Sequence, residues 1–277
     1  MKRKKATISG VVKYVLLSVY AMVTVFPLFW TFTNSFRTNN QIFSTTVLLP
    51  ESFTYLVNYT NILKENILGA YWNSFSLTVT TLVIMLLCVI PAAFLMSQYR
   101  FHLSKALQNL FVVGIIIPRL AILITTFQNF NTFGFLNHKY PITLCYAAFE
   151  IPMAVFLMVG FMQSLPGEIA ESAIIDGCSS FQVLTKIIIP MSQNGIVTVI
   201  ILSFVSIWNE YAYAMVLLSN KKFHTLPMLL ASAKGEFFVD YGLQCAAVMV
   251  AVVPIIVVYI FLQRKIVDGM VAGAVKG

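Results

Sequence analysis

The chain has 277 residues, of which 59% are apolar and only 10% are charged, and its formal net charge is +8. Soluble domains carry about 25% charged residues, so this composition excludes an ordinary soluble fold and indicates a membrane protein whose solvent is largely lipid. The basic residues are scattered, which argues against a nucleic-acid-binding surface; in a membrane protein they set orientation. No metal site or disulfide framework is predicted, because the cysteines lie far apart without C-x-x-C spacing: Cys88, Cys145, Cys178 and Cys245.

Six apolar runs, each about 20 residues or more and bounded by charges or turn formers, predict six transmembrane helices. The runs are continuous rather than alternating, which favours helices over barrel strands, so the predicted class is an all-α polytopic membrane protein. The first run follows MKRKK but is longer than a signal-peptide core and lacks a cleavage site, so we predict a retained span. The predicted spans are 11–32, 74–96, 107–127, 140–162, 195–218 and 243–262.

The distribution of lysine and arginine predicts the orientation. If the N-terminus is cytoplasmic, eleven of these residues fall in inner segments and six in outer segments, and such an excess is typical of cytoplasmic loops. Three tryptophans then lie near the outer ends of their spans, where interfacial aromatic residues prefer to sit: Trp30, Trp72 and Trp208. We therefore predict that both termini and the loop between spans four and five are cytoplasmic.

That loop begins at Ser164 and reads SLPGEIAESAIIDGCSSFQVLTKIIIP. Pro166 suits the first turn of a helix, Glu168 and Glu171 complement the positive end of the helix dipole, and Gly177 supplies a backbone that can end the helix. The sequence therefore predicts a short helix of about ten residues, ~15 Å long.

A second short helix is predicted directly after the first. Ser179 stands three residues before Gln182 in a capping-box arrangement, and Pro190 is expected to close the segment before span five. The first helix is too short to span and suits a groove in another protein; a helix that only closes the loop is the alternative. One face of it is expected to combine small, apolar and acidic groups: Ile169, Ala173 and Asp176.

The loop resembles the EAA motif of ATP-binding-cassette (ABC) importer permeases, whose pattern is E-A-A, three residues, G, nine residues, I-x-L-P. Ser172 stands where the second alanine is usual, and Ile189 where the leucine is usual. Five positions match at the family's spacing: Glu171, Ala173, Gly177, Ile187 and Pro190.

Further matches extend the resemblance over nearly the whole chain and to the carbohydrate permeases of the maltose-transporter type. The resemblance implies one importer transmembrane domain over residues 1–277, with a core region of about 70–265 and the N-terminal span 11–32. The matching positions are Asn73 and Ser74 opening span two, Ile117 and Pro118 in span three, Ile175 to Gly177 in the loop, Trp208 to Glu210 in span five, and the tail 272–277.

The resemblance implies a multi-pass subunit of a bacterial inner membrane that moves a carbohydrate. A di- or oligosaccharide is favoured, and a polyol or glycerol phosphate is the alternative. Its partners would be a second, homologous permease, two ATPase subunits that use ATP and magnesium, and an external solute-binding protein. The loop helix would dock on the ATPase, and the C-terminal tail would reach the same interface. The implied coupling residues are Glu171, Ser172, Ala173, Asp176, Gly177, Ile187 and Pro190, with Lys276 and Gly277 as C-terminal contacts.

Charged groups inside predicted spans are functional candidates because they are costly in lipid. Arg119 and Glu150 fall at similar predicted depth, so we expect Arg119 to pair with Glu150 or with Glu210. Together with Asn209 these residues are candidates for the translocation path, where sugar hydroxyls need hydrogen-bond partners; an ion pair that only holds helices together is the alternative. We also expect three prolines to interrupt their spans: Pro91, Pro118 and Pro152.

Two other function classes are less consistent with the sequence. An ion- or proton-coupled carrier acting alone would leave the EAA-like loop unexplained, and no internal repeat is visible. An intramembrane hydrolase would need a base, but no histidine lies in a predicted span and neither H-E-x-x-H nor G-x-S-x-G occurs. The chain has no phosphate-binding G-x-x-x-x-G-K-[ST] loop, so ATP hydrolysis is expected on a separate polypeptide and no cofactor is expected on this one.

Overall fold

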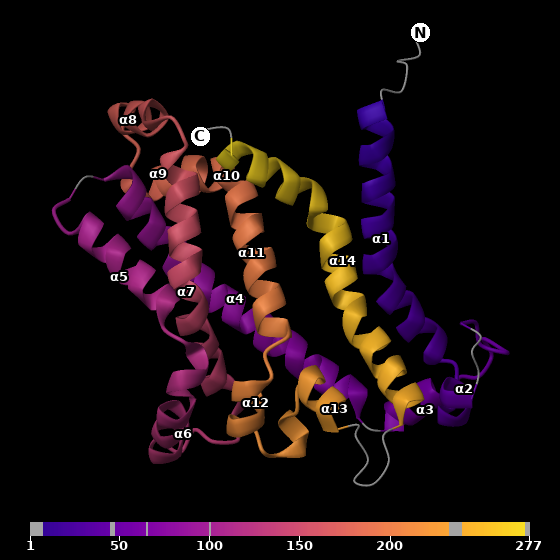
Figure 1. Cartoon of the computed structure of the whole chain (residues 1–277). Coiled ribbons are helices and arrows are strands. Elements are labelled where there is room, and N and C mark those ends of the chain that lie inside the picture. The colour runs from indigo at the N-terminus through magenta and orange to yellow at the C-terminus, as the bar shows by residue number, and fades with distance from the viewer. Residues whose placement is uncertain (1–7, 45–47, 65, 100, 233–239, 275–277) are drawn as a thin grey trace. The chain divides into compact units, whose positions relative to one another are not determined.

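The computed structural model of the chain describes residues 8–44, 48–64, 66–99, 101–232 and 240–274 (Figure 1). Every regular element in these ranges is a helix, which confirms the predicted all-α class. In chain order the elements are α1 (Ile8–Asn34), α2 (Asn39–Ser44), α3 (Val57–Lys64), α4 (Ile67–Gln98), α5 (Ser104–Ile116), η1 (Arg119–Ile122), α6 (Leu123–Thr132), α7 (Lys139–Gln163), α8 (Gly167–Ile175), α9 (Ser180–Val183), η2 (Leu184–Ile188), α10 (Ile189–Met191), α11 (Gln193–Trp208), α12 (Ala212–Leu217), η3 (Lys221–Phe223), α13 (Leu226–Ser232) and α14 (Tyr241–Ala274).

Four of the described helices are each long and apolar enough to cross a membrane: α1, α4, α7 and α14. Two further spans are possible if bent pairs of helices are counted as one span each. The first pair joins α5 to Arg119–Thr132 with a bend of 84°, and the second joins Ser180–Met191 to α11 with a bend of 75°. Each of the six predicted spans overlaps one of these helices or pairs, although the second pair begins at Ser180, in the predicted loop, and ends at Trp208, short of the predicted end at 218.

The third predicted span, 107–127, is broken at a proline. Ile117 and Pro118 are extended, with ψ of 119° and 114°, because proline cannot donate a backbone hydrogen bond and disfavours helical geometry in the residue before it. The expectation of interrupted spans is wrong for Pro91 and Pro152, which lie inside the continuous helices α4 and α7. A long transmembrane helix can accept a proline where neighbouring groups satisfy the freed carbonyl.

The fifth predicted span, 195–218, is also not one helix. α11 ends at Trp208 and α12 begins at Ala212, with Asn209 and Glu210 in the break. The Glu210 carboxylate accepts hydrogen bonds from backbone N–H groups of α12, which stabilises a helix start at this point.

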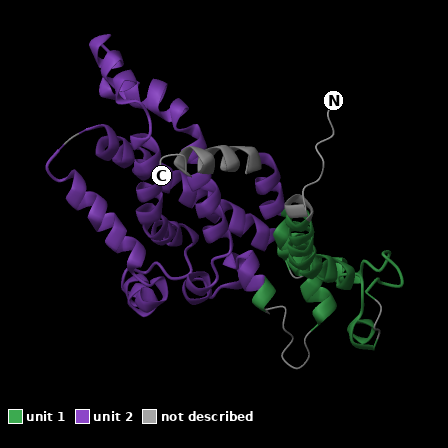
Figure 2. Cartoon of the chain, turned by 45° about the horizontal axis from the view of Figure 1, so that its top comes forward, with its two compact units in different colours: residues 1–67, 230–253 green, residues 68–229, 254–277 purple. Residues whose placement is uncertain are grey.

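The chain divides into two compact units (Figure 2). Unit 1 comprises residues 1–67 and 230–253, and unit 2 comprises residues 68–229 and 254–277. In unit 1 the buried Asn58 Nδ2 donates to the backbone oxygens of Ser35 and Arg37, both at 2.9 Å. Gly242 allows the start of α14 to lie close to this amide, since a Cβ there would come within 2.7 Å of Asn58 Nδ2.

The core of unit 2 forms where α7 packs between α5 and α11. Met158 and Met162 of α7 are fully buried, as are Met85 and Val89 of α4. α11 approaches α7 closely at Gly195, where a Cβ would be 2.6 Å from the Phe161 ring; small residues at helix interfaces permit such approaches in membranes.

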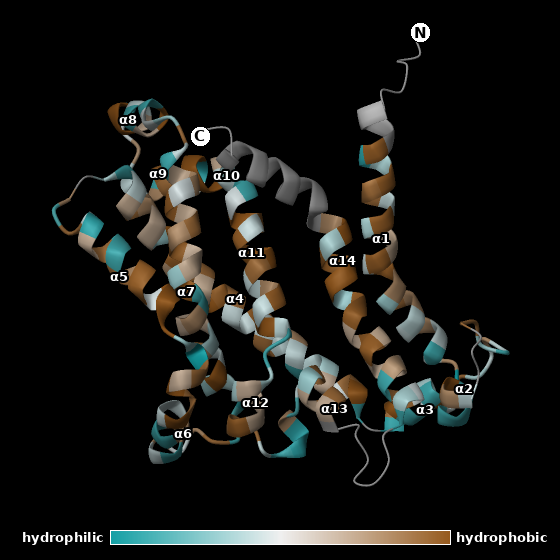
Figure 3. Ribbon diagram, in the orientation of Figure 1, coloured by the Kyte–Doolittle hydropathy of each residue, from teal (hydrophilic) through white to brown (hydrophobic). Residues whose placement is uncertain are grey.

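The long helices are mostly apolar along their length (Figure 3). The apolar side chains of α1 between Val12 and Phe29 are exposed. The stretch Val12–Asn34 is long and apolar enough to cross a membrane, and no residue in its most hydrophobic part is buried. Large exposed apolar surfaces are unfavourable in water but suit a lipid solvent. This distribution confirms the membrane assignment made from composition.

Candidate functional site

The loop between α7 and α11 contains the predicted short helix, α8. Pro166 is the N-cap rather than the first helical residue, and Glu168 lies in the first turn. Ala170 and Ala173 are buried, and α8 packs against the neighbouring α9. The three residues predicted to share one face therefore differ in burial: Ala173 is buried, whereas Ile169 and Asp176 are exposed.

Gly177 ends α8 in the way that the sequence predicts. Its φ is +87°, in the left-handed region that L side chains rarely adopt. Its N–H donates to Ile174 O at 3.0 Å, and the N–H of Cys178 donates to Ala173 O at 2.9 Å. These two bonds form a Schellman motif, which turns the chain sharply out of α8.

The second helix begins with the predicted capping box. Ser179 Oγ accepts from Gln182 N at 3.3 Å, while Ser179 N donates to Gln182 Oε1 at 2.8 Å. The segment closes one residue after Pro190, directly before span five, as the sequence predicts. The helix continues as α9, a π-helical turn η2 and α10 through Pro190 to Met191, and the 75° bend follows it.

The predicted coupling residues divide into an exposed group and a packed group. Glu171, Ser172 and Asp176 are exposed, and Ile187 is half-buried in the π-helical turn. Sequence analysis named Ile175 as a family match but not as a coupling residue; its side chain is 85% exposed on the same short helix.

The second candidate region is a polar cluster around Arg119, at the break between α5 and η1. Arg119 Nη1 lies 2.9 Å from Glu150 Oε1 on α7, so the structure contains one of the two predicted ion pairs. The two side chains differ in exposure, since 43% of the arginine side chain is exposed and only 7% of the glutamate side chain. The carboxylate is therefore buried, while the guanidinium borders an open space.

A serine that sequence analysis missed completes this pair. Ser206 Oγ on α11 donates to Glu150 Oε1 at 2.7 Å and accepts from Arg119 Nη1 at 3.2 Å. Arg119 Nη2 also donates to Phe149 O at 3.2 Å, and the guanidinium carbon lies 5.6 Å from the Phe149 ring centroid. The break in span three is thus joined to both α7 and α11.

Glu210 makes a different set of contacts and does not pair with Arg119. Its carboxylate accepts from Tyr146 Oη of α7, and from the backbone N–H groups of Tyr213 at 2.8 Å and Ala214 at 3.1 Å. Tyr213 in turn donates its hydroxyl to Arg119 O at 2.6 Å. Asn209 is exposed and donates only to Val205 O of its own helix at 2.8 Å, so it stays outside the cluster.

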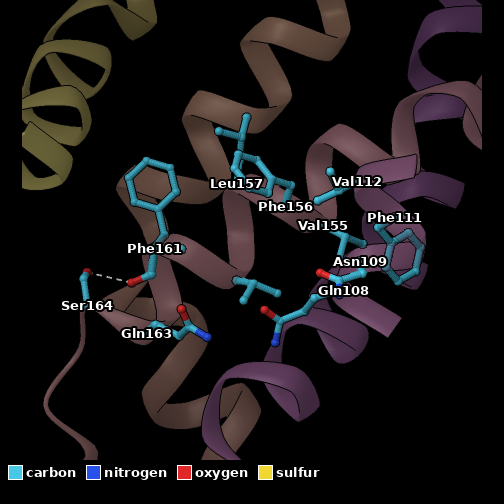
Figure 4. Close-up of a pocket in the computed structure, with 12 residues that line it drawn as sticks. Gln108, Asn109, Phe111, Val112, Val155, Phe156, Leu157, Phe161, Gln163 and Ser164 are labelled. Atoms are coloured by element: carbon cyan, nitrogen blue, oxygen red, sulfur yellow. Dashed lines mark hydrogen bonds between the residues drawn. The ribbon is translucent and has the colours of Figure 1, made fainter. Parts of the chain in front are cut away.

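Three cavities follow one another along unit 2. The first cavity, of about 170 Å³, is lined by residues that include Arg119, Glu210 and Tyr213. The second, of about 710 Å³, has Arg119 and Glu150 as lining residues in common with the first. A third, of about 540 Å³, shares Leu157 with the second. Figure 4 shows its lining of aromatic rings and neutral amides between α5 and α7. The amides and the aromatic residues are Gln108, Asn109, Gln163, Phe111, Phe156 and Phe161.

The cluster can bind hydroxyl groups but offers no set of ligands for a metal. Within the described residues no three His, Cys, Asp or Glu side chains come together. A guanidinium, a serine hydroxyl and a carboxylate facing an open cavity supply both donors and acceptors, which is what a neutral polyol requires.

The comparison with family models matches residues 89–271 to a family described as binding-protein-dependent transport system inner membrane component. Similar curated proteins cover nearly all of the chain. The multiple sugar-binding transport system permease protein MsmG of Streptococcus mutans is 30% identical, over 99% of this chain and 100% of its own. The galactooligosaccharides transport system permease protein GanQ of Bacillus subtilis is 31% identical, over 95% and 94% respectively.

Among solved structures, a chain of a bacterial ABC transporter involved in the import of the acidic polysaccharide alginate has a similar fold. The TM-score is 0.83 at 23% identity, with 96% of this chain and 99% of that chain covered. This likeness supports the arrangement of helices described above.

Proposed function

We propose, since this chain belongs to the family of binding-protein-dependent transport system inner membrane components, that it is the permease subunit of an ABC importer for a di- or oligosaccharide. The family places the chain in the inner membrane, as a transport subunit whose ATPase is a separate polypeptide. The names of similar permeases support a saccharide cargo, including galactooligosaccharides, multiple sugars and diacetylchitobiose.

The observation that carries the coupling role is the rigid helix–turn–helix between α7 and α11. The Schellman turn at Gly177 and the capping box at Ser179 fix the angle between the two short helices. Glu171 is exposed beside the apolar Ile175, so α8 presents an acid and an apolar anchor to a partner. We infer that this surface docks on the ATPase, and that ATPase closure moves α8 and, through η2 and α10, the fifth span.

The complex that follows has a second, homologous permease, two ATPases that bind ATP and magnesium, and an external solute-binding protein. A bacterial alginate ABC transporter of similar fold has been solved in complex with its alginate pentasaccharide-bound periplasmic protein, which supports the last partner. Both termini and α8 would then be cytoplasmic. The proposed C-terminal ATPase contacts, Lys276 and Gly277, lie outside the described residues.

The polar cluster at Arg119 is the proposed part of the translocation path. Its guanidinium would donate to sugar oxygens, while the buried Glu150 keeps the arginine positioned. The proton of the Ser206 hydroxyl already goes to Glu150, so this oxygen would accept from a sugar hydroxyl. Glu210 would support the path without binding the sugar itself, because its carboxylate already accepts a hydrogen bond from the start of α12. Asn209 remains a candidate only by its exposure at the break between α11 and α12.

The coupling role is tested by Glu171→Lys in the purified complex. We expect ATP hydrolysis stimulated by sugar-loaded binding protein, and sugar uptake into proteoliposomes, to fall at least tenfold, because the substitution reverses the charge of the proposed docking surface. Glu168→Lys is the matched control: Glu168 is an exposed glutamate of the same helix, but outside the EAA pattern. Normal uptake by the Glu171 variant would contradict the assignment.

A further inference from the structure

A buried asparagine organises the end of unit 2 that lies opposite α8 (Figure 1). Asn73 of α4 is 7% exposed, and its Nδ2 donates to Lys222 O at 2.9 Å and His224 O at 3.0 Å. Its Oδ1 accepts from Lys139 Nζ at 3.2 Å. The adjacent Ser74 Oγ accepts from Leu226 N at 2.8 Å. These bonds hold the segment after α12 and the first residue of α7 in place.

The turn between α6 and α7 is fixed to the same segment by a second asparagine. Asn137 has a left-handed φ of 60°, and its N–H donates to Leu217 O at 2.9 Å. Its Oδ1 accepts from Ser219 Oγ at 3.0 Å and from Asn220 N at 2.8 Å. The turn is therefore constrained by contacts to residues about 80 positions later in the chain.

These constraints shape a cavity of about 680 Å³ with cationic and aromatic walls. Lys139, Lys222 and His138 contribute to the lining, and no aspartate or glutamate does. The rings of Phe133 and Tyr140 are 67% and 68% exposed at its edge. A preformed pocket with two ammonium groups and no acid has the chemistry to bind a carboxylate.

We propose that this cavity receives an acidic side chain of the external solute-binding protein when that protein docks. The proposal rests on the proposed function, which places this end of unit 2 outside the membrane. The two sequence positions Asn73 and Ser74, which the coupling mechanism does not use, then have a role as positioning residues for the docking surface.

The cavity is better suited to a docking partner than to the transported sugar. It shares no lining residue with the three cavities that follow one another from Glu210 to Gln163. Its lining comes from the turn before α7, from η3 and from the first two turns of α4 and α7. Aromatic residues such as those exposed at its edge are enriched in protein interfaces. Because asparagine contacts already fix the turns, little conformational freedom is lost when a partner binds.

The test uses the reconstituted importer in nanodiscs and titrates it with its cognate sugar-loaded binding protein, with ATP hydrolysis as the readout. We expect Lys222→Glu to raise the half-maximal binding-protein concentration about tenfold, equivalent to ~1.4 kcal/mol, with the rate at saturation retained. Lys222→Gln is expected to give a smaller rise and a weaker dependence on salt. Lys221→Gln is the matched control, because the neighbouring lysine does not line the cavity.

Each outcome decides the proposal. An unchanged half-maximal concentration in both Lys222 variants would overturn it, and the neutral variant preserves this test if the charge reversal prevents assembly. A shift that follows the anionic lipid content of the nanodisc instead of binding-protein concentration would identify a lipid contact and also overturn it. Failure of the proposed function itself is distinguishable, since the wild-type complex would then show no stimulation by the binding protein.

Discussion

At the scale of single residues, the most informative group is the buried carboxylate of Glu150. A buried charge is tolerated only when it is paired and hydrogen-bonded, and here Arg119 and Ser206 provide both. Sequence analysis predicted, from the cost of a charge in lipid, that Arg119 pairs with Glu150 or with Glu210. It did not predict Ser206, because a serine in an apolar span has no local pattern that distinguishes it from the other small residues of that span.

The pairing predicts that two substitutions compensate each other. Arg119→Gln alone should leave the buried carboxylate without its counter-charge and should lower the yield of folded protein. The effect should be smaller than the ~3–5 kcal/mol of a fully buried pair, because 43% of the arginine side chain is exposed. Arg119→Gln combined with Glu150→Gln removes both charges and should recover much of that yield. The measurement is the monodisperse fraction after detergent extraction. If the double variant is no better than the single one, the ion pair does not stabilise the fold.

At the scale of elements, the turn at Gly177 controls the direction of the chain after α8. The space beside its Cα is open, so a side chain there meets no steric obstacle. The constraint is the backbone, because φ of +87° disfavours every residue with a Cβ.

Replacing Gly177 by alanine should therefore strain the turn by about 1–2 kcal/mol and misdirect α9. We expect the stimulated ATPase rate and sugar uptake to fall together, while the complex still assembles. Gly167→Ala is the control, since Gly167 also has open space beside it but no left-handed φ. Equal activity of the two alanine variants would show that the turn geometry does not transmit motion.

At the scale of the whole molecule, the proposals depend on which compartment contains α8. Cys178 directly follows Gly177 and is a half-buried free cysteine, so it reports the side of the membrane on which the loop lies. A membrane-impermeant maleimide should leave Cys178 unlabelled in sealed spheroplasts and label it in inside-out vesicles. Cys178→Ser identifies the signal from this residue. Labelling in spheroplasts would place α8 outside and contradict both the coupling role and the external position of the lysine-lined cavity.

The sequence by itself determined the features that depend on neighbouring residues or on mean hydropathy. The lipid solvent, the six apolar segments, the end of α8 at Gly177 and the capping box at Ser179 all follow from patterns within one or two helical turns. The break at Pro118 was marked by its proline. The break at Ser192 follows Pro190, which was expected to close the segment before span five. The break at Asn209 was not predicted, since no local breaker stands between Trp208 and Ala212.

Only the tertiary structure decided which polar groups meet. Arg119 could have paired with Glu150 or Glu210, and the choice depends on how α7 and α11 are rotated and set in register against the broken third span. The same is true of Lys139 and Lys222, which lie 83 residues apart in the chain and line one cavity because Asn73 and Asn137 bring their segments together. Hydropathy places a residue in a span, but helix rotation and register determine its partners, and these are properties of the packed molecule.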